Sequence, residues 1–218
     1  MLFEEIQPFQ PVVLQMLQNS ILKDRVAHAY LFEGEKGTRK REMSILFAKA
    51  LLCLNQVGGK PCEECTNCKR INHGNHPDLH IVEPDGLSIK KDQIKSLQEE
   101  FSKTGVESKK KIYIIVHGDK MTANAANSLL KFLEEPLADT TAILITENIH
   151  RILPTILSRC QTVSFKPLPK EQLTKQLLGE GIPPHFATLA ANLTNHYEEA
   201  VEICQNEWFA QARIIVLK

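Results

Sequence analysis

The feature that most limits how this chain can fold is a regular alternation of short apolar runs with amphipathic stretches. The run KIYIIV at 111–116 has five successive apolar residues, which is typical of a strand buried on both faces. Four further runs predict strands at 28–32, 79–84, 142–146 and 162–165. The stretches between them have apolar residues at helical spacing and predict helices at 41–53, 88–103, 122–136 and 154–160. The pattern predicts an α/β fold with a parallel sheet covered by helices on both faces.

Polar residues and prolines mark several of the predicted helix ends. Ser88 and Thr122 are predicted as N-caps, because a side-chain oxygen at that position accepts a free backbone N–H of the first turn. Pro154 is expected in the first turn of its helix, and Pro136 is expected to end the helix before it.

The strand pattern stops at the two prolines of KPLPKE, residues 166–171, and only helical patterns follow. We therefore expect an α/β domain over residues 1–165 and a small all-helical domain over residues 166–218. The sequence stops at Lys218 within an apolar helical pattern, so we expect the chain to be a fragment of a longer protein.

Composition argues against several functional classes. Lys and Arg together number 26, as do Asp and Glu, so the chain lacks the basic excess of a strongly nucleic-acid-binding domain. The N-terminus carries Glu4 and Glu5 and has no signal-peptide pattern, and no run approaches the ~20 apolar residues of a membrane span. We expect a cytoplasmic protein without a membrane partner. In that compartment the six cysteines indicate a metal site or free thiols rather than disulfides.

The segment GEKGTRKR follows the first predicted strand and precedes a helix, which is the setting of a phosphate-binding P-loop. Gly34 and Lys40 match the pattern G-x-x-x-x-G-K-[ST], and Gly37 is a further glycine within the loop. Arg39 replaces the second glycine, whose missing side chain lets the backbone approach phosphate closely. Arg41 replaces the hydroxyl residue that ligates Mg2+. We interpret the segment as a degenerate P-loop.

P-loop ATPases also need acidic groups at the end of a buried strand, to hold Mg2+ and to orient the attacking water. KIYIIV is followed instead by His117, Gly118, Asp119 and Lys120. Asp119 lies beyond the strand end and is interpreted as a turn or cap residue beside Gly118. We predict that this chain does not hydrolyse ATP, and we expect neither ATP nor Mg2+ as a cofactor, although Lys40 could still attract an anion.

Cys62, Cys65 and Cys68 have the spacing C-x2-C-x2-C, and Cys53 lies nine residues before them. Four thiolates can close a tetrahedral zinc site, whereas a redox C-x-x-C pair needs no third or fourth cysteine. We predict a structural zinc module over about residues 53–76, in which the metal supports a loop that could not otherwise bury a core.

The residues alone leave the fourth ligand open. His73 and His76 lie close enough to compete with Cys53, which we favour because closed structural sites prefer sulfur. A zinc domain that binds nucleic acid by itself would need a basic surface with aromatic residues, and KPCEECTNCKR has no aromatic residue. Cys160 and Cys204 are interpreted as small apolar residues.

Four segments together resemble one family. HAYLFEGEKGT, the four-cysteine insert, DKMTANAANSLLKFLEEP and ILPTILSRCQTVSF resemble the AAA+ subunits of the bacterial DNA polymerase III clamp loader. They resemble its delta-prime subunits more than its ATP-hydrolysing tau/gamma subunits. The resemblance covers about the first 200 residues. It implies an AAA+ α/β domain followed by a helical lid domain, with the family's C-terminal collar domain absent from this chain.

The resemblance also implies a function and partners. The chain would be a non-catalytic subunit that works with tau/gamma and delta subunits in a hetero-pentamer, which places a sliding clamp on primed DNA. Without the collar that holds the pentamer together, the chain is expected to be monomeric. The alternative within the family is a tau/gamma-like subunit that binds and hydrolyses ATP.

Specific residues receive roles from the same resemblance. In the family, the arginine of a Ser-Arg-Cys motif reaches into the ATP site of the neighbouring subunit, and here that arginine is Arg159, between Ser158 and Cys160. A guanidinium suits the role because it is permanently charged and can bond two phosphate oxygens. The four cysteines stand where the family has zinc ligands, and His117 and Gly118 stand where its hydrolysing members have an Asp-Glu pair.

Overall fold

A computed structural model of the 218-residue chain describes residues 3–102, 110–135 and 139–206. The chain forms two compact units. The first runs to Gly34 and resumes from Arg39 to Phe165, and the second combines residues 35–38 with those from Lys166 onward. We describe the two units separately.

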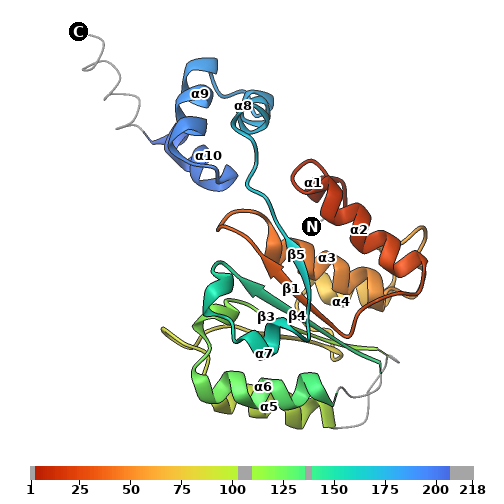
Figure 1. The fold of residues 1–218 in the computed structure, drawn as a ribbon. Coiled ribbons are helices and arrows are strands. Elements are labelled where there is room, and N and C mark those ends of the chain that lie inside the picture. The colour runs from red at the N-terminus through yellow and green to blue at the C-terminus, as the bar shows by residue number, and fades with distance from the viewer. Residues whose placement is uncertain (1–2, 103–109, 136–138, 207–218) are drawn as a thin grey trace. The chain divides into compact units, whose positions relative to one another are not determined.

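The first unit is built on a five-stranded sheet in the order β2–β3–β4–β1–β5 (Figure 1). Every neighbouring pair of strands is parallel. The strands are β1 Ala29–Glu33, β2 Leu79–Val82, β3 Lys111–Ile115, β4 Thr140–Thr146 and β5 Gln161–Ser164. The predicted parallel sheet is confirmed, and each predicted apolar run overlaps one of these strands.

Both faces of the sheet are buried along its central strands β1, β3 and β4. Successive side chains of a strand point to opposite sides. Tyr30 of β1 and Ile114 of β3 pack on one face, whereas Leu31 and Tyr113 pack on the other. The first face is covered by α1 Phe3–Ile6, α2 Pro11–Leu22, α3 Lys40–Leu52 and α4 Thr66–Asn72. The second face is covered by α5 Lys91–Ser102, α6 Ala123–Glu134 and α7 Pro154–Leu157 (Figure 1). This arrangement explains why the strands read as continuous apolar runs rather than as alternating ones.

One predicted cap is confirmed and one is wrong. Thr122 caps α6, and its side chain accepts the backbone N–H of Ala125 at 3.3 Å. Ser88 does not cap α5, because it forms an isolated β-bridge with Asp85 in a turn before the helix. Near the start of α5, the side chain of Gln93 instead accepts the N–H of Lys90 at 3.0 Å.

Of the two prolines predicted at helix ends, Pro154 stands in the first turn of α7, as expected. Its fixed φ suits that position, where its missing N–H would have had no partner within the helix. Helix α6 ends at Glu134, and Pro136, which was expected to stop it, lies outside the described residues.

The second unit contains α8 Lys170–Gly179, α9 Pro184–Leu193 and α10 Tyr197–Gln205, and its described residues form no strand. Leu173, Leu177, Ala187, Ala190 and Ala200 are all fully buried, so the small side chains of α9 let the helices approach closely. The helical pattern predicted beyond residue 206 lies outside the described residues. Among the described residues, no helix is both long enough and apolar enough to cross a membrane.

Candidate functional site

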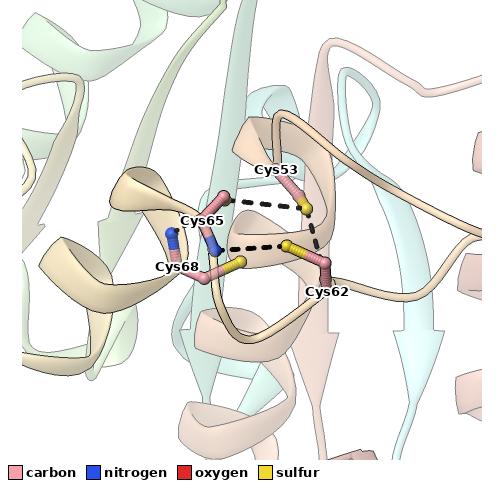
Figure 2. A group of neighbouring side chains, drawn as sticks. All are labelled: Cys53, Cys62, Cys65 and Cys68. Atoms are coloured by element: carbon pink, nitrogen blue, oxygen red, sulfur yellow. Dashed lines mark hydrogen bonds between the residues drawn. The ribbon is translucent and has the colours of Figure 1, made fainter.

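The structure brings Cys53, Cys62, Cys65 and Cys68 together, although they come from three different segments (Figure 2). Cys53 follows α3, Cys62 lies in the loop, Cys65 is the N-cap of α4 and Cys68 lies in its first turn. Their sulfur atoms all lie within 4.8 Å of one another. A tetrahedral zinc ion with Zn–S bonds of about 2.3 Å holds its sulfurs about 3.8 Å apart, so the cluster needs only a small contraction to fit the ion.

Backbone amides point at these sulfurs. The N–H groups of Cys62, Cys65 and Cys68 lie 3.2, 3.3 and 3.4 Å from the sulfurs of Cys53, Cys62 and Cys65 respectively. Burial raises the pKa of Cys65, but hydrogen bonds from the backbone of Cys68 and Leu54 and from neighbouring thiols outweigh it and lower that pKa to about 6. The backbone amide of Cys65 likewise lowers the pKa of Cys62. These two positions therefore favour the thiolate, the form that binds metal.

Burial has the opposite effect on the other two cysteines. It raises the pKa of both Cys53 and Cys68 in the metal-free chain, so the cluster favours a mixture of thiols and thiolates rather than four like charges. A divalent cation would supply the charge that lets all four sulfurs ionise.

Neither predicted histidine alternative joins the cluster. His73 ends α4, and its Nδ1 lies 2.6 Å from the carbonyl oxygen of Lys69. His76 is buried, and its Nδ1 accepts the N–H of Asp78 at 3.1 Å. In the part of the chain that the structure describes, the one group able to hold a metal ion consists of the four cysteines.

The loop after β1 is closed by its own lysine. Lys40 is buried, and its Nζ donates to the carbonyl oxygen of Gly34 at 2.8 Å. Burial lowers the pKa of Lys40, although nearby carboxylates, with Glu147 and Asp119 the strongest, partly oppose this effect. Gly37 has a φ of +77°, in the region that glycine adopts readily.

The two arginines of the loop have partners of their own. Arg39 adopts a left-handed conformation with φ +63°, which costs a residue with a Cβ about 1 kcal/mol. Its guanidinium stacks 4.5 Å from the ring centre of Phe9. Arg41 donates from Nε and Nη2 to Glu83, which follows β2, at 3.1 and 2.7 Å. Both side chains are therefore held at the positions where a working P-loop has a glycine and a Mg2+ ligand.

Beyond β3, His117 adopts a left-handed conformation and Asp119 folds back against the end of β4. Asp119 accepts the hydroxyl of Thr146 at 3.1 Å and the N–H of Glu147 at 3.3 Å, so it links the ends of two adjacent strands. Sequence reasoning did not single out Thr146 or Glu147. In the sequence they are marked only as two polar residues directly after the apolar run AILI. The fold places them at the same edge of the sheet as the loop after β1.

Arg159 lies just after α7 and is about one-third exposed. Its Nη2 lies 2.7 Å from the carboxylate of Glu134 at the end of α6, and its Nη1 donates to the carbonyl oxygen of Thr155 at 2.9 Å. Ser158 is exposed and accepts a weaker bond from the same nitrogen at 3.3 Å. Cys160 is packed against the core, and burial raises its pKa to about 12.

The parallel sheet in the order β2–β3–β4–β1–β5, whose first strand leads through a glycine-containing loop into a helix and whose two faces carry helices, matches the fold of AAA+ P-loop proteins. Two solved structures share this fold. A gamma subunit-related protein of DNA polymerase III from Thermotoga maritima is 25% identical, with a TM-score of 0.56 over 88% of this chain and 57% of that one. The RuvB branch migration motor of the same organism is 11% identical, with a TM-score of 0.55 over 90% and 59%.

The family is narrower than this class. A family model described as DNA polymerase III, delta subunit, matches residues 9–169. The chain belongs to this family.

The curated relatives support the same family assignment. The chain is 59% identical to DNA polymerase III subunit delta' of Bacillus subtilis over 99% of its own length and 65% of that protein. It is 35% identical to DNA polymerase III subunit tau of the same organism over 77% and 30%. The chain thus spans about two thirds of the delta' relative that it matches.

Proposed function

We propose that this chain is part of a delta'-type subunit of the DNA polymerase III clamp loader, and that it serves the ATP site of a neighbouring subunit. In this proposal it works in the cytoplasm with tau/gamma and delta subunits in a hetero-pentamer, which loads a sliding clamp onto primed DNA. Family membership and the 59% identity to a delta' protein support the assignment.

The observation that carries the proposal is the contrast between Lys40 and Arg159. The ammonium of Lys40 is buried and donates a hydrogen bond to its own loop. The lysine of a working P-loop would instead reach phosphate. The guanidinium of Arg159 is partly exposed, and its Nη1 donates to the backbone carbonyl of Thr155. Lys40 is therefore engaged within the chain's own loop, whereas the guanidinium of Arg159 is accessible at the surface.

The partner of Arg159 fits this role. Glu134 offers carboxylate oxygens, and a γ-phosphoryl group offers oxygens of similar geometry with more negative charge. A neighbour's nucleotide would replace Glu134 as the acceptor, and the bond to Thr155 would keep the guanidinium aimed. The arginine would then stabilise the charge that develops on the transferred phosphoryl group.

The chain's own loop would neither hydrolyse ATP nor hold Mg2+. Arg39 puts a side chain where backbone must approach phosphate, and Arg41 cannot ligate a cation. The ion pair of Arg41 with Glu83 also engages the acid that follows β2. These contacts support a loop that is structural rather than catalytic.

The four cysteines would hold one structural zinc ion. All four positions of a tetrahedral site are then filled by protein, which leaves no place for a reactive water. The ion would supply folding free energy to a segment with few buried apolar residues.

The test is a reconstituted clamp loader that carries Arg159→Ala. We expect ATP turnover at the adjoining site to fall by about 10³-fold, the lower range for removal of such an arginine, while the complex still assembles on a sizing column. Arg151→Ala is the matched control, because Arg151 is an exposed arginine in the same segment. Unchanged turnover in the Arg159 variant would remove that residue from the mechanism.

A further inference from the structure

One lysine of the first unit is buried far from the loop after β1. Lys49 lies in the last turn of α3 and is only 1% exposed. Its Nζ lies 2.9 and 2.7 Å from the two carboxylate oxygens of Glu63. Lysine is almost never fully buried without a partner, because moving an unpaired charge out of water is very unfavourable. Burying this ion pair costs desolvation free energy, which an ion pair at the surface would not incur.

In the sequence, Glu63 lies between Cys62 and Cys65 of the cysteine cluster. Its backbone is left-handed, with φ +62°, a conformation that residues other than glycine rarely adopt. On either side of this turn, the N–H of Cys62 lies 3.2 Å from the sulfur of Cys53, and the N–H of Cys65 lies 3.3 Å from the sulfur of Cys62. The unusual turn at Glu63 therefore lies between two amides that point at sulfurs of the cluster.

We propose that the Lys49–Glu63 pair is a positioning device for the metal centre. The lysine holds the Glu63 side chain, and the held side chain keeps the turn in the left-handed geometry that presents the sulfurs to a cation while backbone amides donate to those sulfurs. Helix α3 supplies both Lys49 and, at its end, Cys53, so one rigid element sets the turn and one ligand together. This inference rests on the proposed zinc site and names residues that act on it without touching the ion.

A buried ion pair can also serve the fold alone, and the two roles predict different results. A pair that only supports the fold would alter the unfolding transition and leave zinc affinity unchanged once the chain is folded. A positioning pair changes zinc affinity in the folded chain, because residues behind the ligands commonly alter metal affinity by about 10- to 100-fold.

The experiment measures zinc affinity by competition with a chelating dye, using the 218-residue chain and zinc ion alone. Glu63→Gln is compared with Glu64→Gln, which removes the same charge from an exposed neighbour in the same loop. We expect Glu63→Gln to weaken zinc binding by about 10-fold and Glu64→Gln to leave it within about 2-fold of wild type. The absorption spectrum of the Co2+ form provides a second readout, since its bands report how regularly the four sulfurs surround the ion.

A double variant separates positioning from stability. Replacing both partners, Lys49→Met with Glu63→Met, removes the buried charges together, and such replacements are often neutral for folding. We expect this variant to fold with nearly wild-type stability and still bind zinc more weakly. Equal zinc affinities for Glu63→Gln and Glu64→Gln would overturn the positioning role alone. A wild-type chain that binds no zinc would overturn the metal site itself and this inference with it.

Discussion

At the scale of single residues, Gly34 shows how tightly the loop after β1 is fitted. A Cβ at this position would lie 2.4 Å from the carbonyl oxygen of Phe165, which no real contact allows. Its φ of +153° adds a conformation that side chains rarely adopt. The motif comparison singled out Gly34 for phosphate binding, and the structure adds a packing reason that sequence could not supply, because Phe165 is distant along the chain.

We expect Gly34→Ala to lower the free energy of unfolding by more than about 2 kcal/mol, from overpacking combined with backbone strain. Gly86→Ala is the control, because Gly86 also has a positive φ but has no atom near the added Cβ. That variant should lose about 1 kcal/mol. Urea denaturation of both measures the difference, and equal losses would contradict the steric argument.

A second residue-scale prediction concerns Lys40 and pH. Burial lowers its folded pKa below the ordinary value of 10.5. Between the lowered pKa and 10.5 the unfolded chain binds more protons than the folded chain, so the contribution of Lys40 to stability rises with pH in that window. Wild type should therefore gain stability relative to Lys40→Met as the pH is raised towards 10.5. Urea titrations over a series of pH values measure this gain.

Lys36→Met is the control for that series, because Lys36 is an exposed lysine of the same loop. Its difference from wild type should stay constant across the pH range. A constant difference for Lys40→Met as well would show that the lysine is not buried in solution.

At the scale of elements, the sequence was informative wherever one physical signal dominated. Continuous apolar runs located the strands, since both faces of the sheet are covered. The cap of α6 at Thr122 could be predicted because it is local. The cap at Ser88 failed because a local bridge to Asp85 and the pairing of Ile89 with the distant Met121 move the helix start to Lys91.

The candidate sites could likewise be predicted from the sequence only where the signal was local. Spacing alone was enough to nominate Cys62, Cys65 and Cys68, which lie within one short segment, but it left the fourth ligand open between Cys53 and two histidines. No local signal announced the Lys49–Glu63 contact or the pairing of Arg159 with Glu134. Each joins residues from different elements, and only the fold brings them together.

The cysteine cluster gives an element-scale prediction. The purified chain should contain one zinc ion, and its removal by a chelator should lower the melting temperature, because free zinc at about 1,000 times its dissociation constant stabilises the folded state by about 4 kcal/mol. Cys68→Ser should lose the ion, whereas Cys204→Ser, in the second unit, should keep it. Elemental analysis gives the content and calorimetry the melting temperature. Full zinc content in the Cys68 variant would exclude that residue as a ligand.

At the scale of the whole molecule, the question is whether the chain binds nucleotide for itself. The relationship to tau proteins at 35% identity keeps an ATP-hydrolysing subunit as the rival function. We expect isothermal calorimetry of the chain with ATP to show no Mg2+-dependent binding, because Lys40 is bonded to Gly34 and Arg41 to Glu83. Clear Mg2+-dependent heat at micromolar ATP would favour the rival.

The parallel sheet also gives the molecule a direction. The loop at Gly34 leaves the carboxyl end of β1, whereas Arg159 stands just before the amino end of β5, the strand paired with β1. Those two ends are separated by the length of a five-residue strand, about 17 Å. Arg159 therefore lies at the opposite edge of the sheet from its own loop, so any nucleotide that it contacts would have to be bound by another chain.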